Sequence, residues 1–183
     1  MADALGTQWT RAGHQVLVGG RDPAKTRVLA DRLGSSTQSG TFAEAAEFGD
    51  VVLVAVLHPA AADVLSAGGA EAGALRGKAL IDCTNAVVPI ASSSIAPSAR
   101  RSPNRSPSRR SGRDVVKAFD TCHQSVWRLT PPVFDGRPLV VPLCGDDPDA
   151  IATDRSLVTN IGCEPGDGGR LEHAAPLEAT TRS

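Results

Sequence analysis

A continuous apolar run, Val51–Leu57, constrains the fold of this chain more than any other feature. The run reads VVLVAVL and stops at His58-Pro59. Parallel strands usually lie inside α/β sheets with both faces covered, so they are apolar on both faces. A membrane span would need about 20 apolar residues, far more than this run contains. The run therefore predicts an inner, parallel β-strand that is covered on both faces.

Shorter apolar segments alternate with helical patterns along most of the chain. Further strands are predicted at Val16–Val18, Ala79–Asp82, Val115–Phe119 and Leu139–Cys144, the last weakened as a central strand by Pro142. Helices are predicted after Asp22-Pro23, after the capping box Thr41-x-x-Glu44, from Pro59 to Leu65, and over Asp147–Ile161. This alternation predicts an open, mostly parallel α/β sheet built from right-handed strand–helix–strand units.

In such a sheet, ligands bind beyond the carboxyl ends of the strands. The residues of functional interest are therefore those that follow each predicted strand. They are Gly19–Arg21, His58, Cys83–Asn85, Asp120–His123 and Cys144–Asp147.

Composition narrows the class of protein. The chain has 183 residues and is 41% hydrophobic, which is enough for one domain over residues 1–183. Its four cysteines are widely spaced. This spacing fits neither a zinc site nor a disulfide framework and predicts free thiols in a reducing cytoplasm. The first residues lack the basic and apolar regions of a signal peptide. Together with the shortness of the apolar run, this predicts a soluble cytoplasmic protein with no membrane partner.

Two cations follow the first predicted strand. That strand ends at Gly19-Gly20, Arg21 comes next, and Lys25 lies one turn into the following helix. In dinucleotide-binding folds this position faces the adenosine ribose, where a carboxylate selects NAD and an arginine suits the 2′-phosphate of NADP. The helix start adds N–H donors and the positive end of a dipole. The pattern favours NADP binding over a solvated pair of cations, and Asp22 is explained as the helix cap.

Five segments, taken in order, carry a resemblance to a known family. They are MADALGTQWTRAGHQVLVGGRDPAK, DVVLVAVL, LRGKALIDCTN, VVKAFDT and GRPLVVPLCGDDPDA. Together they resemble the coenzyme F-420-dependent NADP reductases, which have a Rossmann-like, doubly wound fold and transfer a hydride between NADP and a deazaflavin. The resemblance implies this fold and activity here, with NADP as cofactor, coenzyme F-420 as co-substrate and a homodimer as a further expectation.

In that family, a short strand and a loop of the form G-x-G-x-[ML]-[GA] come first. Met1 resembles the fifth position of the loop and Ala2 the sixth, so the first strand and both leading glycines are expected to be missing. The glycines let backbone N–H groups approach the pyrophosphate, and the first strand lies near the centre of the sheet. We therefore expect weak or no NADP binding by this polypeptide, and neighbouring strands that lack one hydrogen-bond ladder.

The resemblance implies further cofactor contacts at Val56, Leu57 and His58, which match positions beside the nicotinamide, and at Asn85, which matches a residue near the hydride-transfer pocket. The ordinary alternatives are an exposed loop histidine at His58 and an Asx turn at Asn85. Asp120 departs from the asparagine that is usual in the family. No metal ligand or catalytic residue is assigned, because hydride transfer between two carriers needs positioning rather than a nucleophile.

Residues 92–113 form a low-complexity basic loop, SSSIAPSARRSPNRSPSRRSGR, with six arginines and no acidic residue. Arg/Ser/Pro repeats can bind RNA, but the segment has no interleaved aromatic residues, so nucleic acid is a disfavoured partner. A basic surface loop and two compensating frameshifts are the alternatives. The last residues, from Gly162, resemble the family's final strand and the start of its carboxyl-terminal helices.

Two other functions stay open from the sequence. The chain could be an NADPH-dependent reductase of another small acceptor, such as an imine or a metal ion. It could also be a non-catalytic remnant or an interaction protein that uses its basic loop.

Overall fold

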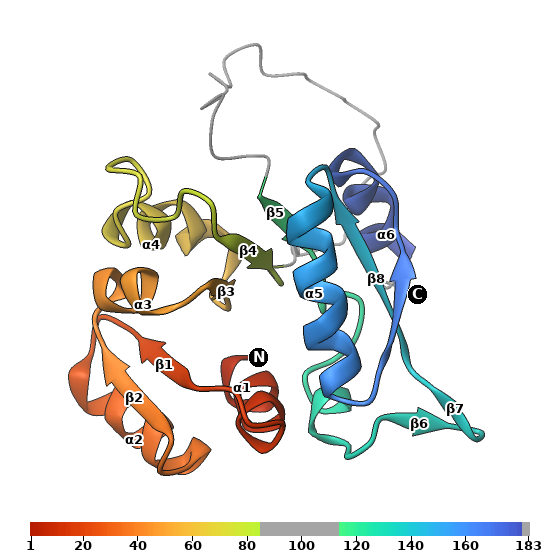
Figure 1. The fold of residues 1–183 in the computed structure, drawn as a ribbon, viewed down its shortest axis with the longest axis horizontal. Helices are drawn as coiled ribbons and strands as arrows, with labels where there is room; N and C mark the ends of the chain where they lie inside the picture. The colour runs from red at the N-terminus through yellow and green to blue at the C-terminus, as the bar shows by residue number, and fades with distance from the viewer. Residues whose placement is uncertain (85–113, 181–183) are drawn as a thin grey trace, which may run out of the picture.

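The computed structural model describes residues 1–84 and 114–180. The predictions for Asn85 and for residues 92–113 lie outside this part of the chain. Two separate sheets form the centre of the described fold. Strands β1 (Val16–Gly19) and β2 (Thr37–Gly40) make the first. The second has the order β3-β4-β5-β8-β9, with bounds Val51–Val54, Ala79–Asp82, Val115–Lys117, Val140–Gly145 and Glu164–Asp167 (Figure 1).

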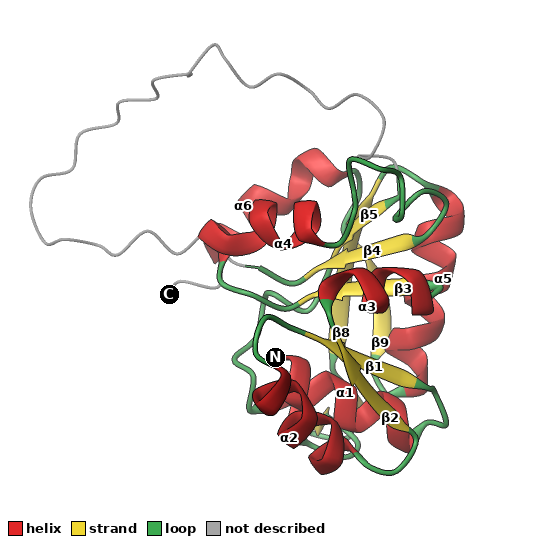
Figure 2. Ribbon diagram, turned by 90° about the vertical axis from the view of Figure 1, so that its left-hand side faces the viewer, coloured by secondary structure: helices red, strands yellow, loops and turns green. Residues whose placement is uncertain are grey.

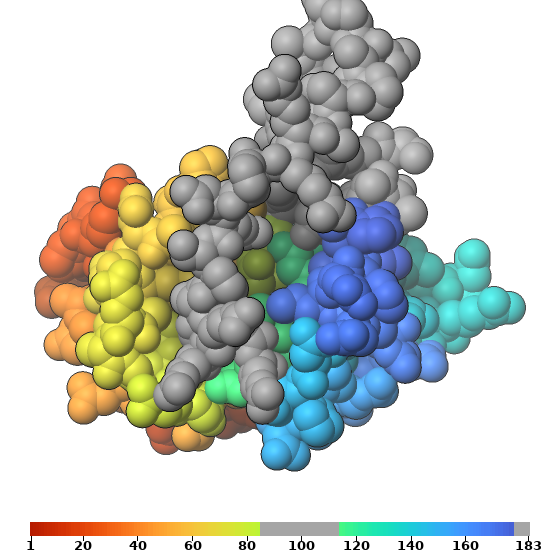
Figure 3. Space-filling model, turned by 90° about the horizontal axis from the view of Figure 1, so that it is seen from above, coloured from red at the N-terminus to blue at the C-terminus, as the bar shows by residue number. Residues whose placement is uncertain are grey.

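Helices surround these sheets (Figure 2). The α-helices are α1 (Ala2–Arg11), α2 (Pro23–Leu33), α3 (Phe42–Phe48), α4 (Ala61–Ala67), α5 (Pro148–Asn160) and α6 (Ala174–Thr180). Short 3-10 helices are η1 (His58–Ala60), η2 (Val126–Arg128) and η3 (Leu171–His173). The hairpin of β6 (Val133–Phe134) and β7 (Arg137–Pro138) projects from the body (Figures 1 and 3). None of the helices in the described residues is long and apolar enough to cross a membrane.

The strand pairing confirms the predicted Rossmann-like α/β fold. The pairs β1–β2, β3–β4, β4–β5 and β8–β9 are parallel, and only β5–β8 is antiparallel among the described pairs of the larger sheet. Strand β4 has the predicted bounds, Ala79–Asp82. Strand β2 was not predicted, because its sequence TQSG has no apolar pattern.

The helix starts predicted at Asp22 and Thr41 are confirmed by their capping hydrogen bonds, whereas the helix predicted from Pro59 is divided into η1 and α4, and no side chain caps either of them. Asp22 Oδ1 accepts from the N–H groups of Ala24 and Lys25 at 3.0 and 3.2 Å. Thr41 and Glu44 form a reciprocal capping box at the start of α3. The hydrogen bond from the Thr41 N–H lowers the pKa of Glu44, because it stabilises the carboxylate.

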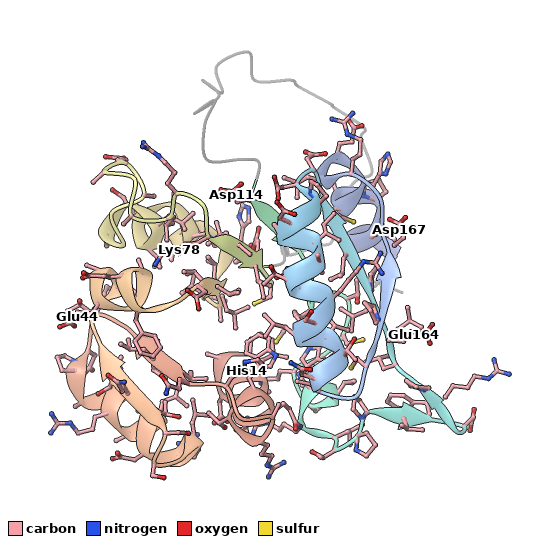
Figure 4. All side chains as sticks on the ribbon, in the orientation of Figure 1. His14, Glu44, Lys78, Asp114, Glu164 and Asp167 are labelled. Carbon is pink, nitrogen blue, oxygen red and sulfur yellow. The ribbon has the colours of Figure 1, made fainter. Side chains whose placement is uncertain are left out.

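The end of α3 is capped by a lysine from a distant segment. Lys78 lies just before β4, and its Nζ donates to the carbonyls of Ala46 and Glu47 at 2.6 and 2.9 Å (Figure 4). A cation at this position also complements the negative end of the helix dipole. Lys78 therefore fixes α3 against the start of β4.

The apolar run that begins at Val51 is less covered than its sequence predicts. The strand ends at Val54, and only Val54 is buried, while Val51, Val52 and Leu53 are half-buried. Strand β1 is likewise half-buried along its length. The expectation of an inner, fully covered strand is wrong for β3, because β3 is the edge strand of its sheet and its edge toward β1 has no strand partner among the described residues. Among the described residues, β1 and β3 therefore belong to separate sheets.

Strand β8 is an inner strand although Pro142 was expected to weaken it as a central strand. Strand β8 lies between β5 and β9. Its ladder with β5 involves only Cys144 and Gly145, whereas Pro142 pairs in register with Gly166 of β9. A proline is tolerated here because the ladder with β5 begins beyond it, so no bond is lost on that side.

Three aromatic rings join α1 to the carboxyl side of the sheet. Phe119, just after β5, makes edge-on contacts with Trp9 of α1 and Trp127 of η2, with ring centroids 5.8 and 5.3 Å apart. Phe119 and Trp127 are fully buried. The three rings thus form the contact between the first helix and the loop that follows β5.

Gln8 is a buried polar residue that reinforces this contact. Its Nε2 donates to the carbonyls of Trp127 and Leu129, both at 3.0 Å, and lies 3.0 Å from Thr130 Oγ1. These bonds satisfy one carbonyl of η2 and one just after it. The Gln8 side chain therefore holds η2 and the residues after it against α1.

Gln8→Leu is expected to lower the free energy of unfolding by about 2–3 kcal/mol, because it leaves carbonyl groups unpaired inside the protein. Urea denaturation followed by circular dichroism would measure the change. Gln38→Leu, on the exposed side of β2, is the matched control and should change stability by less than about 0.5 kcal/mol. Equal effects of the two variants would contradict a role for the Gln8 hydrogen bonds.

Candidate functional site

The candidate site lies at the carboxyl ends of the strands, where the start of α1 meets β4 and the loop after β5. The Met1 amino group donates to Gln124 Oε1 at 3.2 Å. Its positive charge also acts on Cys83, directly after β4. Ala2 begins α1, whose first turn has no side-chain cap. Backbone N–H groups at a helix start without such a cap can bind an anion.

Lys117 holds the end of β4 from the neighbouring strand β5. It is buried, and its Nζ donates to Asp82 Oδ2 at 3.3 Å and to the carbonyl of Thr84. These bonds position the backbone that leads toward Asn85. Sequence analysis did not single out Lys117, although a lysine within the apolar segment VVKAF was an available signal, because a charged residue in a buried strand requires a partner.

The buried cysteines are poor nucleophiles. Burial and the nearby Asp82 carboxylate raise the pKa of Cys83 to about 12, and its Sγ donates to the Val54 carbonyl at 3.2 Å. Burial also raises the pKa of Cys122. The thiols therefore stay protonated near neutral pH. His123 Nδ1 lies 2.9 Å from Ser125 Oγ.

The predicted phosphate-binding cations lie at the carboxyl end of β1. Gly20 follows β1 and its N–H donates to the Gly40 carbonyl at 3.1 Å. Arg21 is exposed and forms no ion pair with the described residues. Lys25 is also exposed, and its Nζ lies 3.7 Å from Asp22 Oδ2. Because Asp22 occupies the N–H groups of Ala24 and Lys25, the side chains rather than these two amides are available to a phosphate.

Gly20 is required by close packing rather than by a left-handed conformation. A Cβ at this position would lie 2.5 Å from Thr26 Cγ2 of α2. The glycine therefore lets the end of β1 approach the first turn of α2. This approach places Arg21 at the edge of the site.

The predicted nicotinamide contacts follow β3. Val56 is half-buried and lines a groove between β1 and β3, and Leu57 is 83% exposed. His58 is exposed at the start of η1. The structure thus brings Val56 and Ala2 to one groove, whereas Arg21 and Lys25 stand outside its lining. No cluster of three potential metal ligands occurs among the residues that the structure describes.

Comparison with known proteins shows which family and which folds this chain resembles. A search of curated proteins found no match. The sequence of residues 1–86 matches the family described as NADP oxidoreductase, coenzyme F420-dependent. The predicted family resemblance is confirmed. The matched region contains the start of α1, Arg21, Lys25 and the end of β4, and members of this family are oxidoreductases.

Solved structures extend the likeness to nearly the whole chain. A hypothetical protein from Sinorhizobium meliloti is 26% identical, with a TM-score of 0.69 over 95% of this chain and 82% of that chain. A structure from Arthrobacter sp. FB24, titled "putative f420 dependent nadp-reductase", is 22% identical, with a TM-score of 0.73 over 97% of this chain and 84% of that chain.

An imine reductase from Myxococcus stipitatus, solved in complex with NAD+, shares the fold at greater distance. It is 16% identical, with a TM-score of 0.65 over 98% of this chain. Only 55% of that chain is covered, so this chain spans about half the length of the imine reductase. At this identity the likeness establishes the fold alone.

Proposed function

We propose that this chain is an NADP-dependent oxidoreductase that transfers a hydride between NADP(H) and a deazaflavin of the coenzyme F-420 type. The observation that carries the proposal is Arg21, an exposed guanidinium at the carboxyl end of β1 without an ion pair among the described residues. Guanidinium groups bind phosphate through paired, charge-assisted hydrogen bonds. The family match supports NADP rather than another phosphate ligand.

The residues present fit part of the cofactor. Arg21 and Lys25 would hold the 2′-phosphate, and the start of α1 would face the pyrophosphate with N–H groups that no side chain caps. Leu57 exposes an apolar side chain after β3, where it would cover one face of the nicotinamide. Bound NADP(H) supplies the hydride, at C4 of the nicotinamide. The protein's part is to orient the two rings and exclude water.

Nucleotide fragments test the role of Arg21 without needing the whole cofactor site. We expect 2′,5′-ADP to bind at least about tenfold more tightly than 5′-AMP, which lacks the 2′-phosphate, because charge-assisted hydrogen bonds contribute at least about 1.4 kcal/mol. Arg21→Gln and Lys25→Gln should each reduce this preference. Calorimetric titration of the full chain would measure both affinities.

Arg27→Gln is the matched control, because Arg27 is an exposed arginine of the same helix outside the proposed phosphate site. It should leave the preference for 2′,5′-ADP unchanged. Equal affinities for the two fragments in the unsubstituted chain would contradict the proposal. The hydride acceptor is tested separately, by asking whether a deazaflavin, an imine or a ferric chelate consumes NADPH absorbance.

A further inference from the structure

Four of the seven large apolar side chains that are exposed in the described residues lie in one short stretch of the chain. They are Leu129, Val133, Phe134 and Val140. Val133 and Phe134 belong to the β6–β7 hairpin, which projects from the body (Figures 1 and 3). All the residues of its two strands are exposed. A two-stranded hairpin with both faces in water is marginally stable by itself, so this hairpin is expected to pack against another surface.

The end of the hairpin presents an aromatic ring beside a cation. Phe134 pairs in register with Arg137 across the two strands. The turn between them is tight, because Asp135 and Gly136 have φ values of +49° and +76°, which a two-residue hairpin turn requires. Cross-strand partners lie on the same face of a hairpin. Phe134 and Arg137, which we call the tip, therefore form one small surface with an apolar ring and a positive charge.

The start of β8 presents the complementary pair. Val141 is fully buried whereas Val140 is 52% exposed, so Val140 lies on the outer face of the sheet. Glu164 of β9 pairs in register with Val140 and is also exposed. Both side chains lie on this face, since a Cβ at Gly166, two residues beyond Glu164, would be 2.8 Å from Val140 Cγ1. Val140 and Glu164, which we call the base, combine an apolar side chain with a negative charge.

The tip cannot cover the base of its own chain. Only Leu139 separates β7 from β8, so the hairpin continues outward from the start of β8 (Figure 1). The Leu139 N–H donates to the Pro132 carbonyl at 2.9 Å, and the Leu139 carbonyl accepts from the Glu164 N–H at 2.9 Å. Figure 4 shows Glu164 on the side of the molecule from which the hairpin projects. The hairpin is therefore held in a fixed position beside the base, with its tip directed away from it.

We propose that two copies of this chain associate through these surfaces, with the tip of each chain packed on the base of the other. Phe134 of one chain would cover Val140 of the second copy, and Arg137 would face Glu164 of the second copy. The contact is isologous, so it occurs twice in a closed dimer. Because the tip and the base carry charges of opposite sign, they favour a second copy over a strongly charged partner such as nucleic acid.

Analytical ultracentrifugation of the full chain tests whether it associates. The interface is small, so we expect a reversible monomer–dimer equilibrium with a dissociation constant of about 10–100 µM. At about 1 µM the chain is then a monomer, and its unfolding is not affected by association. A chain that stays monomeric up to about 500 µM would overturn the proposal.

Phe134→Asp tests the apolar half of the contact. Phe134 is exposed, so the variant should keep the circular dichroism spectrum of the unsubstituted chain. It should weaken association at least about tenfold, because a carboxylate would lose water against Val140. Val28→Asp, at an exposed position of α2, is the matched control and should leave the dissociation constant unchanged. Equal dissociation constants for the two variants would show that the second copy binds elsewhere, which overturns the proposal.

Mixing two charge variants tests the reciprocal contact. Arg137→Glu and Glu164→Arg should each weaken association at least about fivefold, because each brings like charges together at both contacts of the dimer. An equimolar mixture of the two variants should associate like the unsubstituted chain, because both contacts of the mixed dimer again join opposite charges. A mixture that associates no more tightly than its components would show that tip and base do not meet, and the proposal would fail.

Two further variants control for the change in net charge. Arg27→Glu on α2 and Glu71→Arg after α4 alter exposed residues outside the tip and the base. Each should associate like the unsubstituted chain, alone and in the mixture. If Arg27→Glu weakened association as much as Arg137→Glu, net charge rather than the tip–base contact would control the dimer, and the proposal would be wrong.

Discussion

Phe119→Ala is expected to lower the free energy of unfolding by about 3–5 kcal/mol, the usual cost of removing a buried phenyl ring. The side chain is fully buried and contacts Trp9 and Trp127 edge-on, so the variant loses two aromatic contacts and leaves a cavity between α1 and η2. Equilibrium unfolding in urea would measure the loss. The effect should be accompanied by faster hydrogen exchange in α1, which these rings anchor.

Phe134→Ala is the matched control for this variant, because Phe134 lies in β6 with 48% of its surface exposed. It should change stability by less than about 0.5 kcal/mol. Phe119→Gly adds a second comparison. Phe119 has a φ of +64°, a conformation that glycine adopts without strain, so the glycine variant should be no less stable than the alanine variant. A much less stable glycine variant would argue against this backbone conformation.

Asp154 is expected to make the stability of the protein depend strongly on pH. It is fully buried in α5, and neither carboxylate oxygen has a hydrogen-bond partner among the described residues. Burial raises its pKa from 3.8 to about 7. The folded protein therefore holds the proton more tightly than the unfolded chain, and protonation stabilises the fold.

The contribution of Asp154 to stability should be fully present below about pH 4 and should be lost as the pH rises to about 7. The size of the loss is about 4 kcal/mol, because a pKa difference of one unit corresponds to 1.36 kcal/mol. Urea denaturation of the unsubstituted chain and of Asp154→Asn across this range would measure it. The free energy of unfolding of Asp154→Asn should not show this loss between pH 4 and pH 7. The variant should therefore be the more stable protein at pH 8.

Asp31→Asn serves as the control, because Asp31 is exposed on α2. Its stability should follow the pH profile of the unsubstituted chain. Parallel profiles for Asp154→Asn and the unsubstituted chain would show that Asp154 does not carry the pH dependence. The two variants are directly comparable because each replaces one aspartate of a helix with asparagine.

Local interactions explain which parts of the fold could be predicted from the sequence. Asp22, the Thr41–Glu44 pair and Asp147 cap helices where the sequence places them, because a cap bonds to N–H groups two or three residues away. The cation Arg21 was also predicted at the end of its strand. The role of Lys117 was not, because its partners Asp82 and Thr84 belong to another strand.

The sequence by itself determined the alternation of strands and helices, most of the helix starts and the family resemblance of residues 1–86, since these depend on periodicity, on local hydrogen bonds and on ordered motifs. Only the tertiary structure decided that Val51–Val54 is half-covered, that Pro142 lies within the sheet, and that β1 faces β3 across a groove. The physical reason is that burial of a strand depends on what lies beside it. An apolar pattern indicates that a strand is stabilised by burial, whereas the packing of neighbouring elements determines how much of the strand is buried.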